Sequence, residues 1–169
     1  FSQRFGSLET TKTGTRGAGS PLVILSNIGE DNRIVPFADR LNMVNRANMQ
    51  WHADSSFKRI PAQTSILSAR EIPVTGGNTE FVSMRAVYAE LPEDLRQAAE
   101  DRVAIHDFAH SRDKVDPNLM TDSERSALPP VRQAMVLDQS HNFGPSLYIG
   151  SHVSHVEGMT TFESRKLID

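Results

Sequence analysis

The chain has 169 residues, enough for one domain with a hydrophobic core. A net charge of −3 and an apolar content of 38% favour neither a nucleic-acid partner nor a membrane partner, and the longest apolar run, at 22–25, is far too short to span a bilayer. The absence of cysteine excludes disulfides, thiolate metal sites and cysteine nucleophiles; it also fits a reducing compartment, so we expect a cytoplasmic protein.

Both ends of the chain carry helix signals that are cut short. Gly6 follows a short run that reads as the last turn of a helix. Thr160 and Glu163 form a capping-box pattern that opens a helix just before the last residue. We therefore expect an internal portion of a longer protein, in which residues 1–169 form a single domain that lacks its N-terminal and C-terminal segments.

The first part of the chain predicts a loop and then a strand. Residues 9–21 show no periodicity, and there Lys12 and Arg16 are either solvated charges or contacts for an anionic substrate. Residues 22–25 are continuously apolar and predict a buried strand. Residues 27–45 are rich in turn-forming residues and their structure is ambiguous.

The clearest chemical signal lies at residues 48–57. His52 and Asp54 are two positions apart, so a β-strand would place both side chains on one face, about 6.6 Å apart along the backbone. An imidazole and a carboxylate on one face supply two of the three ligands of the facial triad that binds non-haem Fe(II). The alternative is a strand-end histidine hydrogen-bonded to a neighbouring carboxylate, because a lone His-x-Asp pair is a weak motif.

The middle of the chain predicts strands followed by helices. Residues 64–70 predict a core strand, a turn at Gly76 and Gly77 follows, and 79–82 begins the next strand. Ser83 is expected to cap a helix that runs to Leu91, and Pro92 to start a second helix that ends near Arg102.

A strand at 103–105 leads into a pair of histidines. The spacing of His106 and His110 would suit a metal site on a helix, but the strand pattern argues against one, so we expect two partly exposed histidines. The charged, Pro-bounded residues 111–130 are expected to cover a pocket or to pack against another subunit, which would make the protein a homo-oligomer.

The last third of the chain predicts paired strands at 131–137 and 146–149. His152 and His155 follow, and from the residues alone either one could complete the metal site. Many short strands without regular alternation of strand and helix predict a mainly β fold with flanking helices.

Two motifs together resemble those of a known family. The run WHADSSF at 51–57 and the run GGNT at 76–79 are similar, in sequence and spacing, to the motifs of the TauD/TfdA family of Fe(II)- and 2-oxoglutarate-dependent dioxygenases. Further family landmarks are RFG at 4–6, MRA at 84–86 and YIGSH at 148–152. The resemblance spans nearly the whole chain and is nearer to the 2,4-D branch. It implies a double-stranded β-helix (jelly-roll, cupin-like) core, incomplete in this chain.

The resemblance also implies a metal site and its ligands. Fe(II) would be bound by His52 and Asp54, the catalytic pair, and the third ligand would be a histidine beyond the last residue of this chain. His152 would then belong to the substrate pocket rather than to the metal.

Three further residues receive roles from the resemblance. Thr79 would hydrogen-bond the distal carboxylate of 2-oxoglutarate, the alternative being a β-branched strand residue. Asn48 would touch the substrate, the alternative being a turn-forming asparagine. Thr11 occupies the position where taurine-specific enzymes place a substrate-binding histidine, so taurine itself is not the expected substrate.

The resemblance implies an oxidoreductase that uses O₂ and 2-oxoglutarate to hydroxylate a small, anionic substrate, with release of succinate and CO₂. Aryloxyalkanoates, sulfonates and alkyl sulfates all fit that class. Two alternatives stay open: a non-catalytic or degenerate cupin-type metal-binding module, and a metal-dependent hydrolase.

Overall fold

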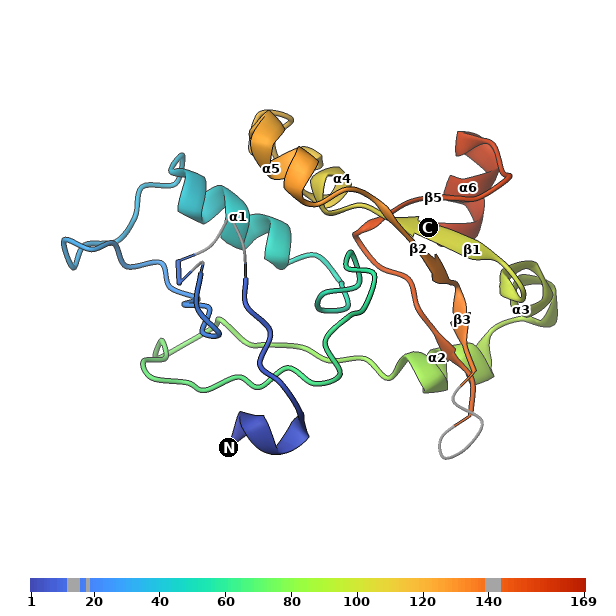
Figure 1. Ribbon diagram of the computed structural model, residues 1–169, viewed down its shortest axis with the longest axis horizontal. Helices are drawn as coiled ribbons and strands as arrows, with labels where there is room; N and C mark the ends of the chain where they lie inside the picture. Colours follow the sequence, from blue (N-terminus) through green and yellow to red (C-terminus); the bar gives the residue numbers. More distant parts are fainter. Residues whose placement is uncertain (12–15, 18, 139–143) are drawn as a thin grey trace.

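The structure is a computed structural model that describes residues 1–11, 16–17, 19–138 and 144–169. Its C-terminal half consists of two antiparallel sheets flanked by helices, whereas the N-terminal half is mostly extended chain around one helix (Figure 1). Sheets with flanking helices are the coarse architecture that the sequence predicts. Within the described ranges, no helix combines the length and the apolar character that crossing a membrane would need.

The larger sheet is built around β1 (Val103–His106), which confirms the strand expected at 103–105. β1 lies between β2 (Val131–Ala134) and β5 (Val153–Val156), and both pairings are antiparallel. Alternate residues of β1 are buried, as expected for a strand with one face against a core. Ala104 on that face is fully buried.

The smaller sheet pairs β3 (Val136–Leu137) with β4 (Ser146–Leu147). The pairing expected between 131–137 and 146–149 is therefore present in its inner part, while the first residues of that segment pair with β1 instead. Met135 separates the two pairings and is buried.

Helices pack against both sheets: α2 (Met84–Glu90) contacts β4, and α6 (Thr161–Ile168) contacts β5. α2 and α3 (Glu93–Ala99) follow the predicted caps, and Ser83 Oγ accepts a hydrogen bond from the N–H of Ala86. α6 starts with the predicted capping box. The buried residues that these elements share are Tyr88, Ala99, Ala104, Met135, Leu147, Val153 and Val156.

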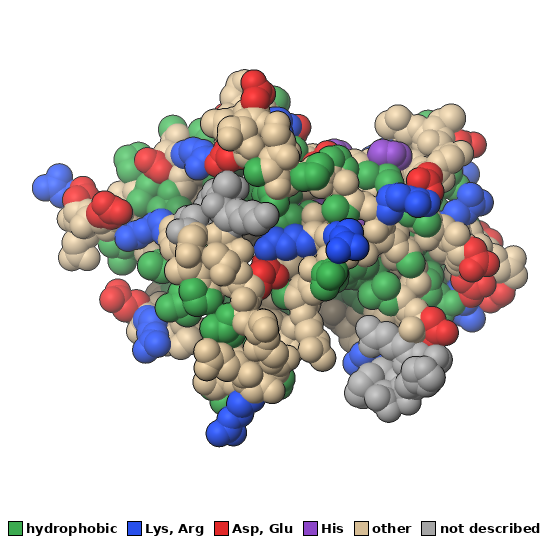
Figure 2. All heavy atoms as spheres, viewed as in Figure 1, with side chains coloured by type: hydrophobic (Ala, Val, Ile, Leu, Met, Phe, Trp, Pro, Cys, Tyr) green, Lys and Arg blue, Asp and Glu red, His purple; other side chains and the backbone are tan. Residues whose placement is uncertain are grey.

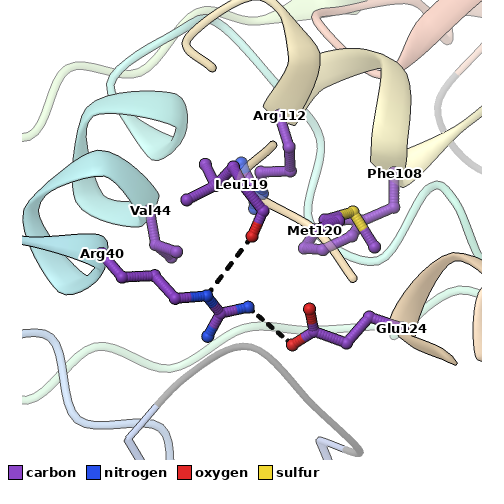
Figure 3. Close-up of a pocket in the computed structure, with 7 residues that line it drawn as sticks. All are labelled: Arg40, Val44, Phe108, Arg112, Leu119, Met120 and Glu124. Carbon is purple, nitrogen blue, oxygen red and sulfur yellow. Dashed lines mark hydrogen bonds and ion pairs between the residues drawn. The ribbon is translucent and has the colours of Figure 1, made fainter. Parts of the chain in front are cut away.

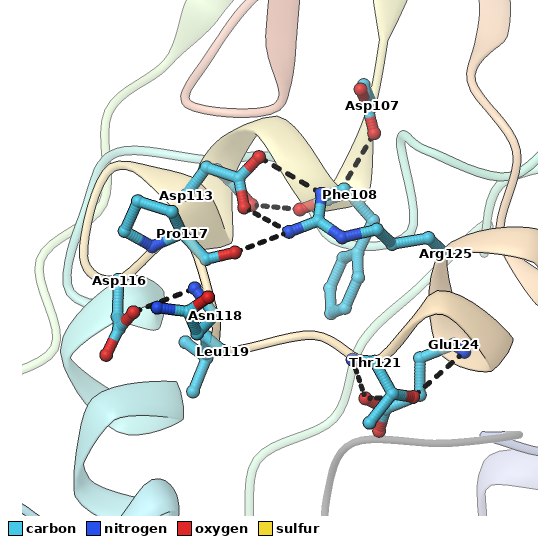
Figure 4. A network of polar contacts seen from close by, with 12 residues as sticks. Asp107, Phe108, Asp113, Asp116, Pro117, Asn118, Leu119, Thr121, Glu124 and Arg125 are labelled. Atoms are coloured by element: carbon cyan, nitrogen blue, oxygen red, sulfur yellow. Dashed lines mark hydrogen bonds and ion pairs between the residues drawn. The ribbon is translucent and has the colours of Figure 1, made fainter.

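The charged excursion at 111–130 folds into a compact helical corner. It contains the end of α4 (Phe108–Asp113) and all of α5 (Asp122–Ala127). The Arg125 guanidinium joins the two helices by donating to both carboxylate oxygens of Asp113, at 3.1 and 2.6 Å (Figure 4). This corner packs beside α1 (Arg40–Asn48). Whether it also contacts another subunit stays a prediction.

Three predicted strands are wrong in this structure. Residues 22–25, 64–70 and 79–82 are extended but belong to no strand, and only Ile24 forms an isolated bridge, with Arg16. The predicted burial at 22–25 is also wrong, since Leu22 is 73% exposed. An extended segment becomes a strand only when a neighbour takes its backbone hydrogen bonds, and these segments lack such a neighbour among the described residues.

The ambiguous region at 27–45 contains the start of a helix that the sequence pattern did not reveal. α1 begins after Asp39, whose carboxylate accepts a hydrogen bond from the N–H of Leu41. At the start of the chain, η1 (Ser2–Phe5) is a single 3-10 turn that ends at Gly6, as predicted. Apolar side chains lie among charged ones over the surface that Figure 2 shows.

Candidate metal and substrate site

His52 and Asp54 point at each other, with 3.2 Å between Nε2 and Oδ1. The predicted strand at this point is wrong, because residues 51–57 contain a bend at Trp51 and a turn at 54–57 but no strand. The turn is closed by a hydrogen bond from the N–H of Lys58 to the carbonyl of Ser55, and Ser55 has a φ of 56°. The turn thus brings the two side chains together from irregular backbone instead of from one face of a strand.

The backbone beside His52 selects which ring nitrogen carries hydrogen. Nδ1 lies 2.7 Å from the carbonyl oxygen of Gln50, and a carbonyl only accepts, so Nδ1 is the protonated nitrogen. A metal-binding histidine typically donates its second ring N–H to such a carbonyl. The lone pair of Nε2 is then directed at the Asp54 carboxylate, and the two groups require a cation between them, either a proton or a metal ion.

The charges of the pair follow from that contact. The hydrogen bond to Asp54 raises the pKa of His52 above its ordinary value, against the opposing effect of partial burial. The same hydrogen bond lowers the pKa of Asp54, so this carboxylate is ionised at neutral pH.

The pair fits two adjacent ligands of an octahedral metal ion. Two ligand atoms at about 2.1 Å from a metal and at a right angle to each other are about 3.0 Å apart, close to the 3.2 Å between Nε2 and Oδ1. The side chains of His52 and Asp54 are 27% and 55% exposed, so further ligands can reach the same point. No group of three or more potential ligands from His, Cys, Asp and Glu occurs among the described residues.

Gly150 braces the segment that carries His52. Its φ is 155°, and a Cβ at this position would come within 3.1 Å of the Cα of His52 and of the carbonyl oxygen of Trp51. The next residue, Ser151, donates its N–H to that same carbonyl at 2.8 Å. Only glycine allows the two chain segments to lie so close.

The structure brings His152 next to the pair. Its ring lies edge-on to the ring of His52, with 5.9 Å between centroids, and it also contacts Phe57 and Phe108. His152 is buried, its Nδ1 lies 2.9 Å from Ser111 Oγ, and burial lowers its pKa to about 3. His152 is therefore a neutral, buried ring that lies directly beside the candidate metal site.

Asn48 is connected to Phe108 and His152 through Arg112, a residue that the sequence analysis did not single out. Arg112 Nη2 donates to Asn48 Oδ1 at 2.8 Å, and the guanidinium lies over the ring of Phe108, 4.1 Å from its centroid. Arg112 is only 4% exposed, and burial lowers its pKa to about 10. The sequence analysis assigned no role to Arg112, and no signal in the sequence marks it as buried.

A small pocket adjoins this arginine between α1 and α4 (Figure 3). In the close-up, Arg112 and Phe108 come from α4, and Arg40 and Val44 come from α1. Neither ligand of the candidate metal pair lines it.

Two of the predicted site residues, Thr79 and Thr11, form no hydrogen bond with the pair within the described ranges. Thr79 is exposed on an extended segment, and within the described part of the chain its hydroxyl makes no hydrogen bond. Thr11 is half-buried and its carbonyl accepts the N–H of Gly19. Arg16 donates to the carbonyl of Ile28 at 2.6 Å. Lys12 lies outside the described residues.

The expectation of two partly exposed histidines is wrong for His106. It is buried, stacks on Tyr148 at 5.3 Å, and burial lowers its pKa to about 4. His110 is half-buried on α4, beside Arg165. Because one histidine lies on a strand and the other on a helix, the two do not form a metal pair. His155 is exposed and lies beside Ser154.

Comparison with known proteins matches these features to one family. The family model described as "Taurine catabolism dioxygenase TauD, TfdA family" matches residues 1–169. The chain is 35% identical to an alpha-ketoglutarate-dependent 2,4-dichlorophenoxyacetate dioxygenase of Burkholderia sp. (strain RASC), over 99% of this chain and 58% of that protein. It is 31% identical to an (S)-phenoxypropionate/alpha-ketoglutarate-dioxygenase of Delftia acidovorans, over 100% of this chain and 59% of that protein.

A solved structure is also similar. The crystal structure of AAD-2 in complex with Mn(II) and N-oxalylglycine superimposes with a TM-score of 0.86 at 36% identity, over 99% of this chain and 58% of that one. The chain thus spans a little under three fifths of the length of each of these proteins.

Proposed function

The chain belongs to the TauD, TfdA family of dioxygenases, and on that basis we propose that the whole protein is an Fe(II)- and 2-oxoglutarate-dependent dioxygenase that hydroxylates a small anionic substrate. The observation that carries the proposal is the convergence of His52 and Asp54, with the N–H of His52 turned away toward a carbonyl. Such a pair can hold a metal at two adjacent positions and leave the others open.

In this proposal each residue near the metal has one task. His52 and Asp54 bind Fe(II), and the third ligand is a histidine that lies outside residues 1–169. The carbonyl of Gln50 keeps the lone pair of Nε2 on the metal side of the ring. When bound, iron and 2-oxoglutarate supply the activation of O₂ and the transfer of a hydroxyl group, with release of succinate and CO₂.

Other residues are assigned to the co-substrate and the substrate. The hydroxyl of Thr79 donates to the distal carboxylate of 2-oxoglutarate, which a free hydroxyl can do at little steric cost. Asn48 and His152 face the substrate, and Thr11 lies in a loop over it. An aryloxyalkanoate is the preferred substrate class, because the relatives described above act on such acids; sulfonates and alkyl sulfates are the next.

We also assign residues 1–169 to one dioxygenase domain with a double-stranded β-helix core that needs further chain to be complete. The exposed apolar side chains of Leu22, Ile24, Ile66 and Leu67 support this assignment, because they lie on extended segments without strand partners among the described residues. In the whole protein, the amides of 22–25 and 64–70 should be protected from hydrogen exchange, and in residues 1–169 alone they should exchange rapidly. Rapid exchange in both would contradict the assignment.

The test of the function uses the whole protein. Succinate release should require Fe(II), 2-oxoglutarate and O₂ together, and Asp54→Ala should lower it at least 100-fold. Asp94→Ala, which removes an exposed carboxylate from the first turn of α3, is the matched control and should retain full activity. Product formation without O₂ would favour the hydrolase, and iron binding without 2-oxoglutarate turnover would favour the non-catalytic module.

Residues 1–169 alone should bind iron weakly, since two protein ligands leave most of the coordination to water. Tight Fe(II) binding by this chain alone would place the third ligand within it.

A further inference from the structure

We propose that Arg112 is a positioning residue that fixes the side-chain amide of Asn48, so that the substrate group beside Asn48 is a hydrogen-bond acceptor and not an ammonium group. The proposal rests on the function proposed above and adds a rule for which substrates the site admits. The acceptor is an ether oxygen or an oxyanion oxygen, as in a carboxylate, a sulfate or a sulfonate.

The direction of the amide follows from the chemistry of the guanidinium. A guanidinium group carries only donors, so the atom of Asn48 that faces Arg112 Nη2 at 2.8 Å is the oxygen. The NH₂ group is therefore directed away from Arg112. It makes no hydrogen bond within the described ranges, and Asn48 is half-buried, so both of its donors are available to a ligand.

Among the residues that the structure describes, Arg112 has no counter-ion. Its guanidinium is buried against the ring of Phe108, and its Nε and Nη1 atoms have no hydrogen-bond partner in the part of the chain that the structure describes. No described carboxylate forms an ion pair with it either. A buried charge without a partner is destabilising, so stability alone does not account for this arginine. Its hydrogen bond to Asn48 is the specific contact that remains.

A short series of contacts connects this amide to the metal pair. Asn48 is the last residue of α1 and lies four positions before His52. The ring of Phe108 contacts Arg112 on one side and His152 on another, and His152 contacts His52.

These positions favour one class of ligand over another. An ammonium group beside Asn48 would meet two N–H donors and the positive field of Arg112, and both contacts are repulsive. An oxygen acceptor would receive a hydrogen bond and would be attracted by the same field. The site should therefore bind an acid more tightly than an amine of the same shape.

The experiment compares two probes that share an aromatic ring and an ether oxygen, phenoxyacetate and 2-phenoxyethylamine. Their dissociation constants are measured by calorimetry on the whole protein loaded with Mn(II) and N-oxalylglycine. The unaltered protein should bind the acid at least tenfold more tightly than the amine. In Arg112→Met the amide is free to rotate, and this preference should fall at least fivefold; Arg112→Lys, which keeps a donor and a charge, should restore part of it.

Two further variants separate positioning from a general structural role. Arg40→Met removes a cation from the same helix as Asn48, one that is paired with Glu124, and should leave the preference within twofold of its original value. Asn48→Asp is nearly isosteric and gives Arg112 a carboxylate partner, so it should fold with an equal or higher Tm. It should nevertheless lose at least fivefold of the preference, because a carboxylate has no donor for the acid.

Three results would overturn the proposal: equal affinity of the unaltered protein for the two probes, binding of neither probe, or an unchanged preference in both Arg112→Met and Asn48→Asp. Turnover of 2-oxoglutarate is measured separately and without these probes. A protein that prefers the acid but consumes no 2-oxoglutarate would contradict the proposed function and leave the role of Arg112 intact.

Discussion

Replacing Gly150 by alanine should disturb the candidate metal site by pushing on the backbone that carries His52. A Cβ at this position would lie 3.1 Å from the Cα of His52 and from the carbonyl oxygen of Trp51, and both of these are backbone atoms that cannot rotate away. The segment that carries His52 would have to shift by a few tenths of an ångström. We therefore expect Gly150→Ala to affect both stability and metal affinity.

The size of the effect has two parts. A side chain at a φ of 155° costs about 1–3 kcal/mol in backbone strain. The contact with the neighbouring backbone adds a further 1–3 kcal/mol or so, as overpacking typically does. Gly158→Ala is the matched control, because Gly158 has a φ of 76° and a Cβ there would meet no atom within 4 Å. The control should lose only about 1–2 kcal/mol.

Urea denaturation of the two variants gives the free energy of unfolding, and paramagnetic resonance of bound Mn(II) gives the metal affinity of the whole protein. Gly150→Ala should be the less stable variant and should bind Mn(II) roughly 10–100-fold more weakly, as expected when the support of a metal ligand is displaced. Gly158→Ala should bind Mn(II) normally. Equal destabilisation by the two substitutions, or unchanged Mn(II) affinity in Gly150→Ala, would refute the reasoning.

Three further predictions concern buried polar groups. The pKa of His106 is lowered to about 4 by burial, so the unfolded chain takes up its proton first and stability is lost as pH falls from 6.5 toward 4. His152, whose pKa burial lowers to about 3, adds its own loss below pH 6.5, so the total loss measured by urea denaturation should be smaller in His106→Phe by roughly 3 kcal/mol; an equal loss in that variant would assign the whole effect to other groups. Ser111→Ala removes the hydrogen-bond partner of the buried His152 and should cost about 1–3 kcal/mol in urea denaturation, whereas a change below 0.5 kcal/mol or so would mean that the ring finds another partner. Ser164→Ala removes the acceptor of the Val156 N–H and should cost a similar 1–3 kcal/mol or so, with faster hydrogen exchange at that amide; an unchanged exchange rate would count against it.

Local signals in the sequence were sufficient for several elements of the fold. Ser83 and the pair Thr160 and Glu163 predict helix starts because a capping side chain bonds to a backbone N–H two or three residues away. The strand at 103–105 was predicted correctly because its apolar residues suit a sheet that is buried on one face. The helix starts depend only on residues that are adjacent in the sequence, whereas the strand also required β2 and β5, which lie far along the chain and pair with it on both sides.

Other predictions failed because they needed a distant partner that the described chain does not supply. The apolar pattern at 22–25 and 64–70 favours strands, yet a strand also requires a second segment to receive its hydrogen bonds, and the described residues provide none. His106 was expected to be partly exposed, but it is buried and its ring stacks on Tyr148, 42 positions further along the chain.

The sequence by itself determined which chemical groups are available, namely an imidazole and a carboxylate two positions apart, within motifs that specify a dioxygenase family. Only the tertiary structure decided how these groups meet, since a turn, and not a strand, brings His52 and Asp54 together. It also decided that Arg112 is buried and bonded to Asn48, 64 positions away. The physical reason is that burial and hydrogen bonding between distant residues depend on how the whole chain packs, whereas residue type and spacing are already present in the unfolded polymer.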